Sequence, residues 1–118
     1  LLGHVQEAEA YVSWLVRLTE QEIVDNPEHL QIMYGLRGQH TLTEEILDHF
    51  EGYKGSRPVR IGNAAYNQKQ WDVYGNIINT IWHLHELRGH TECDMQVWNL
   101  VRSLANHVVH IWDKPDFG

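Results

Sequence analysis

The segment from Gly52 to Gly75 reads GYKGSRPVRIGNAAYNQKQWDVYG, and the fold of the chain is predicted outward from it. Its first half contains turn-forming glycines and Pro58, which exclude regular structure. Its second half continues into a predicted helix over residues 64–88, with Gln68 and Asp72 in the first turns. A loop that is rich in hydrogen-bond donors and leads into a helix N-terminus is typical of the rim of a polar-ligand pocket. We therefore expect the other helices to be its scaffold.

Three long helices account for most of the chain, which is predicted to be all-α. Residues 4–24 have apolar side chains at three- and four-residue spacing, and Asn26-Pro27 should end this helix, because a residue before proline avoids the helical region. The helix over 64–88 is apolar on more than one face, so burial on both sides is expected. Gly75 costs this helix about 1 kcal/mol relative to alanine, which a close neighbour or a bound ligand would explain. Arg88-Gly89 is a typical C-terminal stop.

The third helix is predicted over residues 92–112, with Thr91 as its N-cap. One broad apolar stripe is expected to pack in the core: Met95, Trp98, Val101, Leu104 (or Ala105), Val108, Ile111 and Trp112. Because the turn before this helix is short, the second and third helices should be antiparallel neighbours. The loop before the second helix and the loop after the third then lie at the same end, which is the layout of a helical barrel with a pocket at one mouth.

The connection over residues 27–63 is predicted to be mostly irregular. LQIMY at 30–34 is expected to form a short strand or an extended segment, and residues 30–42 are expected to close as a small hairpin. A helical turn is expected over 43–50, with Thr43 as its N-cap. A loop of this length inside a helical domain is usually functional when it is ordered.

Composition and charge restrict the class of protein. The chain has 118 residues, of which 42% are hydrophobic, enough for one domain with a core. A formal charge of −7 argues against nucleic acid as a partner, because phosphate binding needs clustered Lys and Arg. No apolar stretch approaches a membrane span, and no signal peptide is visible, which favours a cytoplasmic over a secreted location. The chain begins at Leu1 and stops at PDFG, so we expect a piece of a larger protein, truncated at both ends.

Two arginines and two amide side chains in the opening segment are candidate ligand-binding residues. Arg57 and Arg60 flank a proline that stiffens the backbone. A guanidinium offers a planar fork of donors suited to a carboxylate or to vicinal sugar hydroxyls; the alternative is that each arginine pairs with an acidic neighbour and staples the loop. Asn63 and Gln68 continue the polar approach to the second helix. Gln68 and Asp72, four residues apart, should share a helix face, and helix capping or inter-helix hydrogen bonding is the alternative role.

Aromatic side chains are abundant around this loop. Tyr53 lies on it, and Trp71 and Tyr74 follow near the start of the second helix. Aromatic faces can stack on the apolar faces of sugar rings. Core packing is the alternative, and it is expected for most of the five tryptophans, including Trp98 and Trp112.

Neither a metal site nor a cofactor is expected, although the chain has nine histidines. The clustered ones are His83, His85 and His90, and His107 and His110. The last two are three residues apart, whereas the better-attested ligand pair on a helix is four apart. No HExxH motif accompanies them, and Cys93 is the only cysteine, so no internal disulfide can form. No partner histidine can be assigned that would make Cys93 a nucleophile.

Three segments resemble glycoside hydrolase family fifteen: LQIMYG at 30–35, LTEEILDHFEGYKGSRPVRIGNAA at 42–65 and QWDVYG at 70–75. That family holds glucoamylases and bacterial-type trehalases, and the similarity runs from about residue 5 to the end of the chain. The GYKGSRPVRIGNAA block is closer to the bacterial branch than to the fungal starch-degrading enzymes, which carry Trp-Gly-Arg-Pro where this chain has Ser56-Arg57-Pro58.

The resemblance implies part of an (α/α)6 barrel, so that residues 1–118 would be a partial catalytic domain. It implies an inverting hydrolase of α-glucosidic bonds in trehalose, maltose or short α-glucans, without a cofactor. One glutamic acid would donate a proton and a second glutamate would activate water on the opposite face. The loop would line the sugar pocket, which makes the expected substrate-binding residues Tyr53, Arg57, Arg60, Asn63 and Gln68.

Neither catalytic glutamate is expected within the chain. In the family pattern the proton donor follows a PDxG sequence within a few residues, and here the chain stops at Pro115-Asp116-Phe117-Gly118. The carboxylates Glu44, Glu45, Glu51 and Glu86 are therefore not assigned catalytic roles, and the 118 residues alone should show no turnover. The oligomeric state is left open. Two alternatives remain: a non-catalytic helical interaction module built on an αα-hairpin, and a metal-dependent enzyme that uses the histidine cluster.

Overall fold

The computed structural model describes residues 3–89 and 94–116, without the side chains of residues 20 and 21. It consists of two compact units, a helical unit (residues 1–30 and 70–117) and a loop unit (residues 31–69). The helical unit contains the helices α1 (Val5–Asp25), α2 (Asp72–Leu87) and α3 (Met95–Ile111). The prediction of an all-α chain with three long helices is therefore confirmed.

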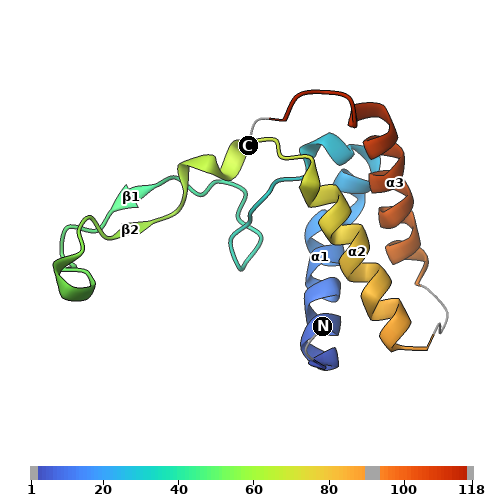
Figure 1. Cartoon of the computed structure of the whole chain (residues 1–118), viewed down its shortest axis with the longest axis horizontal. Coiled ribbons are helices and arrows are strands. Elements are labelled where there is room, and N and C mark those ends of the chain that lie inside the picture. The colour runs from blue at the N-terminus through green and yellow to red at the C-terminus, as the bar shows by residue number, and fades with distance from the viewer. Residues whose placement is uncertain (1–2, 90–93, 117–118) are drawn as a thin grey trace. The chain divides into compact units, whose positions relative to one another are not determined.

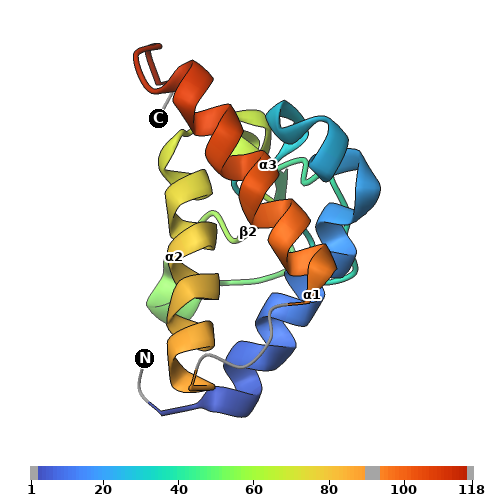
Figure 2. The same cartoon turned by 90° about the vertical axis from the view of Figure 1, so that its right-hand side faces the viewer.

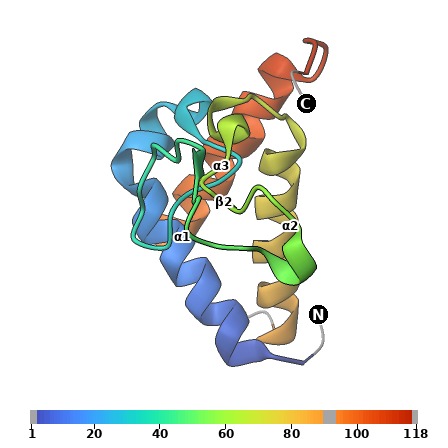
Figure 3. The ribbon, with the colours of Figure 1, turned by 90° about the vertical axis from the view of Figure 1, so that its left-hand side faces the viewer.

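The three helices of the helical unit pack against one another in every pairing. Figure 1 shows α2 running antiparallel to α3, with the start of α2 and the end of α3 at the same end of the unit. Figure 2 shows α3 between α1 and α2 in projection, and Figure 3 shows the start of α1 close to the end of α2. An ion pair joins those two ends, because Arg88 Nε donates to Glu9 Oε1 at 2.9 Å. The predicted antiparallel neighbours are thus confirmed.

The core of the helical unit consists of side chains spaced three, four or seven residues apart on each helix, together with Leu30 after α1. The buried residues are Val12, Leu15, Thr19 and Ile23 on α1, Leu30 after it, Tyr74, Ile77, Ile81 and Leu84 on α2, and Leu100, Leu104 and Ile111 on α3. Each buried apolar side chain of this size stabilises the fold by about 1.5–3 kcal/mol. The single buried polar side chain among the described residues, Thr19, is satisfied by its own helix, because its hydroxyl donates to Leu15 O at 2.9 Å.

Two helix ends agree with the prediction. α1 ends at Asp25, and the amide of the C-cap residue Asn26 donates to Glu22 O at 2.8 Å before Pro27 begins a short 3-10 helix. α2 ends at Leu87 and is followed by Gly89, whose φ of +70° favours glycine.

Two helix starts differ from the prediction. α2 begins at Asp72 rather than at residue 64, because residues 64–67 form a separate 3-10 helix and Gln68 is extended, with ψ at 150°. α3 begins at Met95, and its N-cap is Asp94, whose carboxylate accepts a hydrogen bond from Gln96 N at 2.8 Å. The predicted cap Thr91 lies outside the described residues.

The predicted apolar stripe of α3 has the wrong register in part. Leu104 and Ile111 are buried as predicted. Trp98 is half exposed and Trp112 is 77% exposed, whereas Leu100, which the predicted stripe did not include, is buried. None of the five tryptophans is buried, so the expectation that most of them pack in the core is wrong. Periodicity alone cannot choose between overlapping apolar faces of one helix; the contacts with α1 and α2 select the face that carries Leu100.

α2 buries one face rather than two. Tyr74, Ile77, Ile81 and Leu84 are buried, whereas Trp82 is 54% exposed. A Cβ atom built on Gly75 would meet no atom within 4 Å, so the close neighbour expected at this glycine is not found among the described residues. In the described part of the helical unit, α2 and α3 therefore each keep exposed apolar side chains, Trp82 on α2 and Trp98 on α3.

The loop unit contains one antiparallel pair, β1 (Glu45–Ile46) and β2 (Arg60–Ile61), in which Glu45 faces Ile61 and Ile46 faces Arg60. Backbone hydrogen bonds extend the pair on both sides, from Leu47 N to Val59 O and from Asn63 N to Leu42 O, each 2.8 Å long. The helical turn predicted over 43–50 is therefore wrong, because these residues supply one arm of the hairpin.

The hairpin predicted over 30–42 is also wrong, because residues 30–34 form no strand. The turn between Gly35 and Gly38 does form, since Gly38 N donates to Gly35 O at 2.8 Å. Gln31 ties this turn region to the end of the unit, because its Nε2 donates to His40 O at 3.2 Å and to Tyr66 O at 3.1 Å.

No residue from 31 to 69 is buried, and both strands are exposed along their whole length. A two-stranded hairpin without a hydrophobic face against a core is marginally stable in water. By its own residues, the loop unit therefore forms no hydrophobic core. Within the part of the chain that is described, no helix is both long and apolar enough to cross a bilayer.

Candidate functional site

The predicted site residues lie on the β1–β2 hairpin and just after it (Figure 1). The tip of the hairpin contains a tight turn, in which Ser56 N donates to Tyr53 O at 3.0 Å. Gly52 precedes this turn with φ at +75°, and a Cβ atom there would collide with the carbonyl oxygen of Ser56. Glycine is therefore required at this position, both for its backbone angle and for the space it leaves.

Tyr53 and Arg57 present their side chains from this tip. Tyr53 is 81% exposed, and the ammonium of Lys54 lies 5.5 Å from the centre of its ring. Arg57 is exposed and precedes Pro58, to which it is joined by a cis peptide bond. Both side chains could reach a ligand in the surrounding solvent.

Arg60 and Asn63 make structural contacts. Arg60 Nη1 lies 3.1 Å from Glu44 Oε1 across the hairpin, and both side chains are partly exposed. This is the pairing that the alternative interpretation of the arginines requires. Asn63 Oδ1 accepts a hydrogen bond from Ala65 N at 2.9 Å and so caps the 3-10 helix Ala64–Asn67. These contacts fix the direction of both side chains.

Gln68 does not share a helix face with Asp72, which corrects the prediction. Gln68 follows the 3-10 helix in an extended conformation, whereas Asp72 is in the first turn of α2 and accepts a hydrogen bond from Asn76 Nδ2 at 3.2 Å. The long helix expected over 64–88 was the basis of the pairing, so the pairing fails with it. Tyr53, Arg57 and Arg60 are thus brought onto one hairpin, Asn63 follows directly, and Gln68 stands apart.

Of the other aromatic candidates, Tyr74 belongs to the core: it is 1% exposed, and its hydroxyl donates to Pro27 O at 3.0 Å. The sequence did not predict the observed role of Trp71, which is to bind the segment that follows α3. Its indole Nε1 donates to Lys114 O at 3.2 Å and to Pro115 O at 3.0 Å, and its amide donates to the Asp116 carboxylate at 3.0 Å. The antiparallel topology pointed to this meeting of segments, but no local pattern joins residues so distant in sequence.

The histidines do not gather into a metal site in the described part of the chain, where no three His, Cys, Asp or Glu side chains come together around a common point. The ring of His107 packs 5.0 Å from that of Tyr74, and His110 Nδ1 lies 2.6 Å from Asn106 O. His90 and Cys93 lie outside the described residues.

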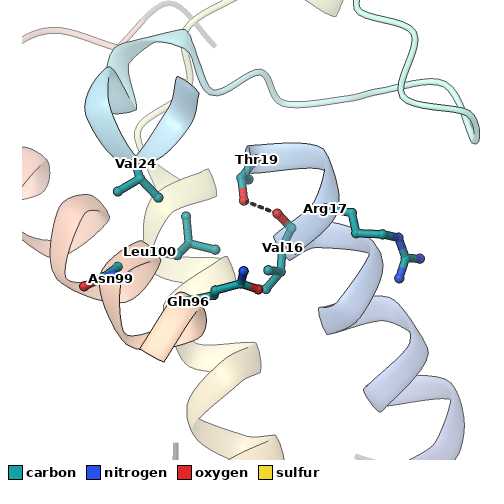
Figure 4. A pocket seen from close by; sticks show the side chains of 7 residues that line it. All are labelled: Val16, Arg17, Thr19, Val24, Gln96, Asn99 and Leu100. Carbon is teal, nitrogen blue, oxygen red and sulfur yellow. Dashed lines mark hydrogen bonds between the residues drawn. The ribbon is translucent and has the colours of Figure 1, made fainter. Parts of the chain in front are cut away.

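A cavity of about 390 Å³ opens between α1 and α3 (Figure 4). Its lining residues are Val16, Arg17, Thr19, Val24, Gln96, Asn99 and Leu100. Among the described lining residues, Arg17 supplies the only charged side chain, and in Figure 4 it points away from the others. These lining residues include none of the predicted site residues and no pair of acidic or basic groups.

The model of the family described as glycosyl hydrolases family 15 matches residues 1–118, which is the whole chain. The chain therefore belongs to glycosyl hydrolases family 15, a class of glycosidase, and the resemblance predicted from its loop segments is confirmed. A trehalase of Mycolicibacterium smegmatis is 35% identical over 119 residues, and a trehalase of Thermoplasma acidophilum is 32% identical over 115 residues. These alignments cover 99% and 98% of this chain, but only 17% and 18% of the relatives.

A trehalase of Mycobacterium tuberculosis is 34% identical, with 99% of this chain and 17% of the relative covered. The chain thus spans about a sixth of the length of the relatives it matches, as expected for a fragment. No solved structure was found to match the chain. The all-α fold with three long helices is consistent with part of the helical barrel of this family.

Proposed function

We propose that the complete protein hydrolyses an α-glucosidic bond, with trehalose as the first substrate to test and maltose and short α-glucans as the others. The observation that carries this proposal is the family match over the whole chain. The names of the relatives support trehalose in particular, because all three relatives described above are trehalases. Hydrolysis with inversion requires a protonated carboxyl group and a carboxylate far enough apart to admit a water molecule.

This chain would supply one wall of the sugar pocket rather than the catalytic pair. Its substrate-binding residues would be Tyr53, Arg57, Arg60 and Asn63, together with Gln68. An exposed ring and two guanidiniums on one hairpin suit a ligand with apolar ring faces and many hydroxyl groups. The Arg60–Glu44 ion pair would hold one guanidinium in place while leaving donors on its other side, since both side chains are partly exposed.

The carboxylates on this chain fit poorly as the catalytic acid, which supports the expectation that the 118 residues alone are inactive. Glu44, Glu45, Glu51 and Glu86 are all exposed or paired at the surface. A general acid that is protonated near neutral pH is usually desolvated in an enclosed site. The loop unit also buries no residue, so its binding groups are not preorganised without the rest of the protein.

The test compares the 118-residue chain with the complete protein that contains it. Each is incubated with trehalose, maltose and maltotriose, glucose release is measured, and the anomer first released is identified by NMR. We expect the complete protein to release glucose with inversion and the chain to release none. If the complete protein releases no glucose from any of the three, the proposed function is wrong.

The wall residues are tested by substitution in the complete protein. Arg57→Ala should raise KM by about 10- to 100-fold, because hydrogen bonds to a charged group contribute about 1.5–3 kcal/mol. Arg37→Ala is the matched control, since Arg37 is an exposed arginine of the same loop unit that lies outside the hairpin. Equal KM values for the two variants would remove Arg57 from the sugar pocket.

A non-catalytic helical interaction module is the second candidate function. The exposed apolar residues of α3 favour it, namely Met95, Trp98 and Val109. Tryptophan fluorescence of the complete protein distinguishes the two, because a sugar-binding pocket should respond to trehalose or maltose. No response at high sugar concentration would favour the module, and loss of activity with a chelator would favour a metal-dependent enzyme.

A further inference from the structure

The turn at the tip of the β1–β2 hairpin sets the backbone of Tyr53 and Lys54. Ser56 N donates to Tyr53 O at 3.0 Å, which closes the turn. The two residues inside it, Lys54 and Gly55, have φ of +52° and +75°. Positive φ at both central positions is the property of a tight type I′ turn. The turn therefore determines where both side chains leave the hairpin.

Lysine is an unfavourable residue for the position that Lys54 occupies in this turn. A residue with a Cβ atom is strained at positive φ, because the Cβ atom crowds the following carbonyl oxygen. Asparagine and glycine are preferred there, and asparagine followed by glycine is the usual pair of a type I′ turn. Strained residues of this kind cluster at ligand-binding sites. The backbone alone would favour asparagine, so the lysine side chain is the feature to be explained.

The side chain of Lys54 lies over the ring of Tyr53. Its ammonium is 5.5 Å from the centre of the ring, which is within the range of a cation–π interaction. Tyr53 is nevertheless 81% exposed, so most of its surface stays open. An ammonium over one face of the ring leaves the opposite face for stacking. The contact thus orders the ring relative to the hairpin and determines which face can meet a ligand.

We propose that Lys54 is a positioning residue for the substrate, which holds the Tyr53 ring so that its opposite face stacks on a sugar ring of the α-glucoside. This inference rests on the proposed function. Ordering a mobile side chain on binding costs affinity, so a ring that is already held binds the ligand more tightly. Lys54 acts through the ring of Tyr53 and touches no reacting atom in this role.

The test compares Lys54→Asn with the wild type in the complete protein. Asparagine suits the turn and removes the ammonium, so the urea midpoint should not fall. KM for the hydrolysed sugar should rise by about two- to tenfold, which is the effect of ordering one side chain on binding, with kcat within about twofold. If the lysine served the turn alone, asparagine would be at least as good and KM would stay unchanged.

Two further variants complete the comparison. Lys54→Arg keeps a cation that can lie over the ring, so it should have a KM close to the wild-type value. Arg37→Asn is the matched control, because Arg37 is an exposed cation of the same loop unit that lies outside the hairpin. Its KM should equal that of the wild-type protein.

Tyr53→Leu shows whether Lys54 acts through the ring. We expect Tyr53→Leu to raise KM and Lys54→Asn to add less than about twofold to it, because no ring is left to be held. The positioning role is overturned if Lys54→Asn leaves the wild-type KM unchanged, if Tyr53→Leu leaves it unchanged, or if Lys54→Asn has its full effect without the ring. Each of these results leaves the proposed function intact. A complete protein that hydrolyses none of the three sugars would overturn both.

Discussion

Replacing Gly75 with alanine tests the finding that α2 leaves one face open. Gly75 is in the second turn of α2 and has a helical backbone, and an added Cβ atom would meet nothing within 4 Å. Alanine should therefore gain the difference in helix propensity without steric cost. That difference is about 0.5–1 kcal/mol, because glycine loses more backbone freedom on folding.

The measurement is urea denaturation of the 118-residue chain, followed by circular dichroism in the helical region. With a urea m-value of about 1–3 kcal/mol per molar, a gain of this size raises the midpoint by about 0.2–1 M. Gly89→Ala is the matched control. A Cβ atom at Gly89 also meets nothing within 4 Å, but its φ is +70°. Alanine in that left-handed conformation costs about 1–2 kcal/mol, so the midpoint should fall.

The two variants separate the effect of backbone conformation from the effect of steric crowding, because an added Cβ atom has space at both positions. If Gly75→Ala lowers the midpoint as Gly89→Ala does, an atom lies close to Gly75 and the face is not open. The same substitution in the complete protein gives a further result. A loss of stability there, after a gain in the 118-residue chain, would show that another part of the protein packs closely against Gly75.

Three further predictions concern the helical unit of the 118-residue chain. Leu104→Ala should lower the free energy of unfolding by about 2–5 kcal/mol, since Leu104 is 0% exposed. Val109→Ala, at an exposed site of α3, should change it by less than about 0.5 kcal/mol. Equal effects of the two variants in denaturant titrations would contradict the buried face of α3. Asp94→Ala should lower the free energy of unfolding by about 1 kcal/mol, because the Asp94 side chain caps α3 by accepting from Gln96 N. Asp94→Asn should retain most of the stability. An unchanged denaturation midpoint in Asp94→Ala would refute the cap. Tryptophan emission should be red-shifted towards that of the unfolded chain, because none of the five tryptophans is buried, and a blue-shifted spectrum would show that some are covered.

The family was predictable from the sequence because its signal is local. The GYKGSRPVRIGNAA block and the QWDVYG segment occupy contiguous positions, and the match over the whole chain confirms them. The existence and order of the three long helices were predictable for a similar reason, since apolar spacing repeats over several turns. The stops at Asn26 and Arg88-Gly89 follow from backbone chemistry that acts within one or two residues.

The details of the candidate site were less predictable, because they depend on pairing between distant residues. Residues 43–50 have a plausible helix cap at Thr43, but residues 42–47 pair with residues 59–63 instead, and that competition is decided outside the local sequence. The extended conformation of Gln68 separates it from Asp72, although their spacing fits one helix face. The role of Tyr53, Arg57, Arg60 and Asn63 in sugar binding remains a prediction.

By itself, the sequence determined the glycosidase family, the all-α class and the existence and order of the three long helices, since each depends on residues that are close together along the chain. Only the tertiary structure decided which face of α3 is buried, where α2 begins, and that Trp71 holds Lys114–Asp116. The physical reason is that several faces and pairings are compatible with the same apolar pattern. The choice among them is made by contacts between helices, and those contacts form only when residues far apart in the sequence come together.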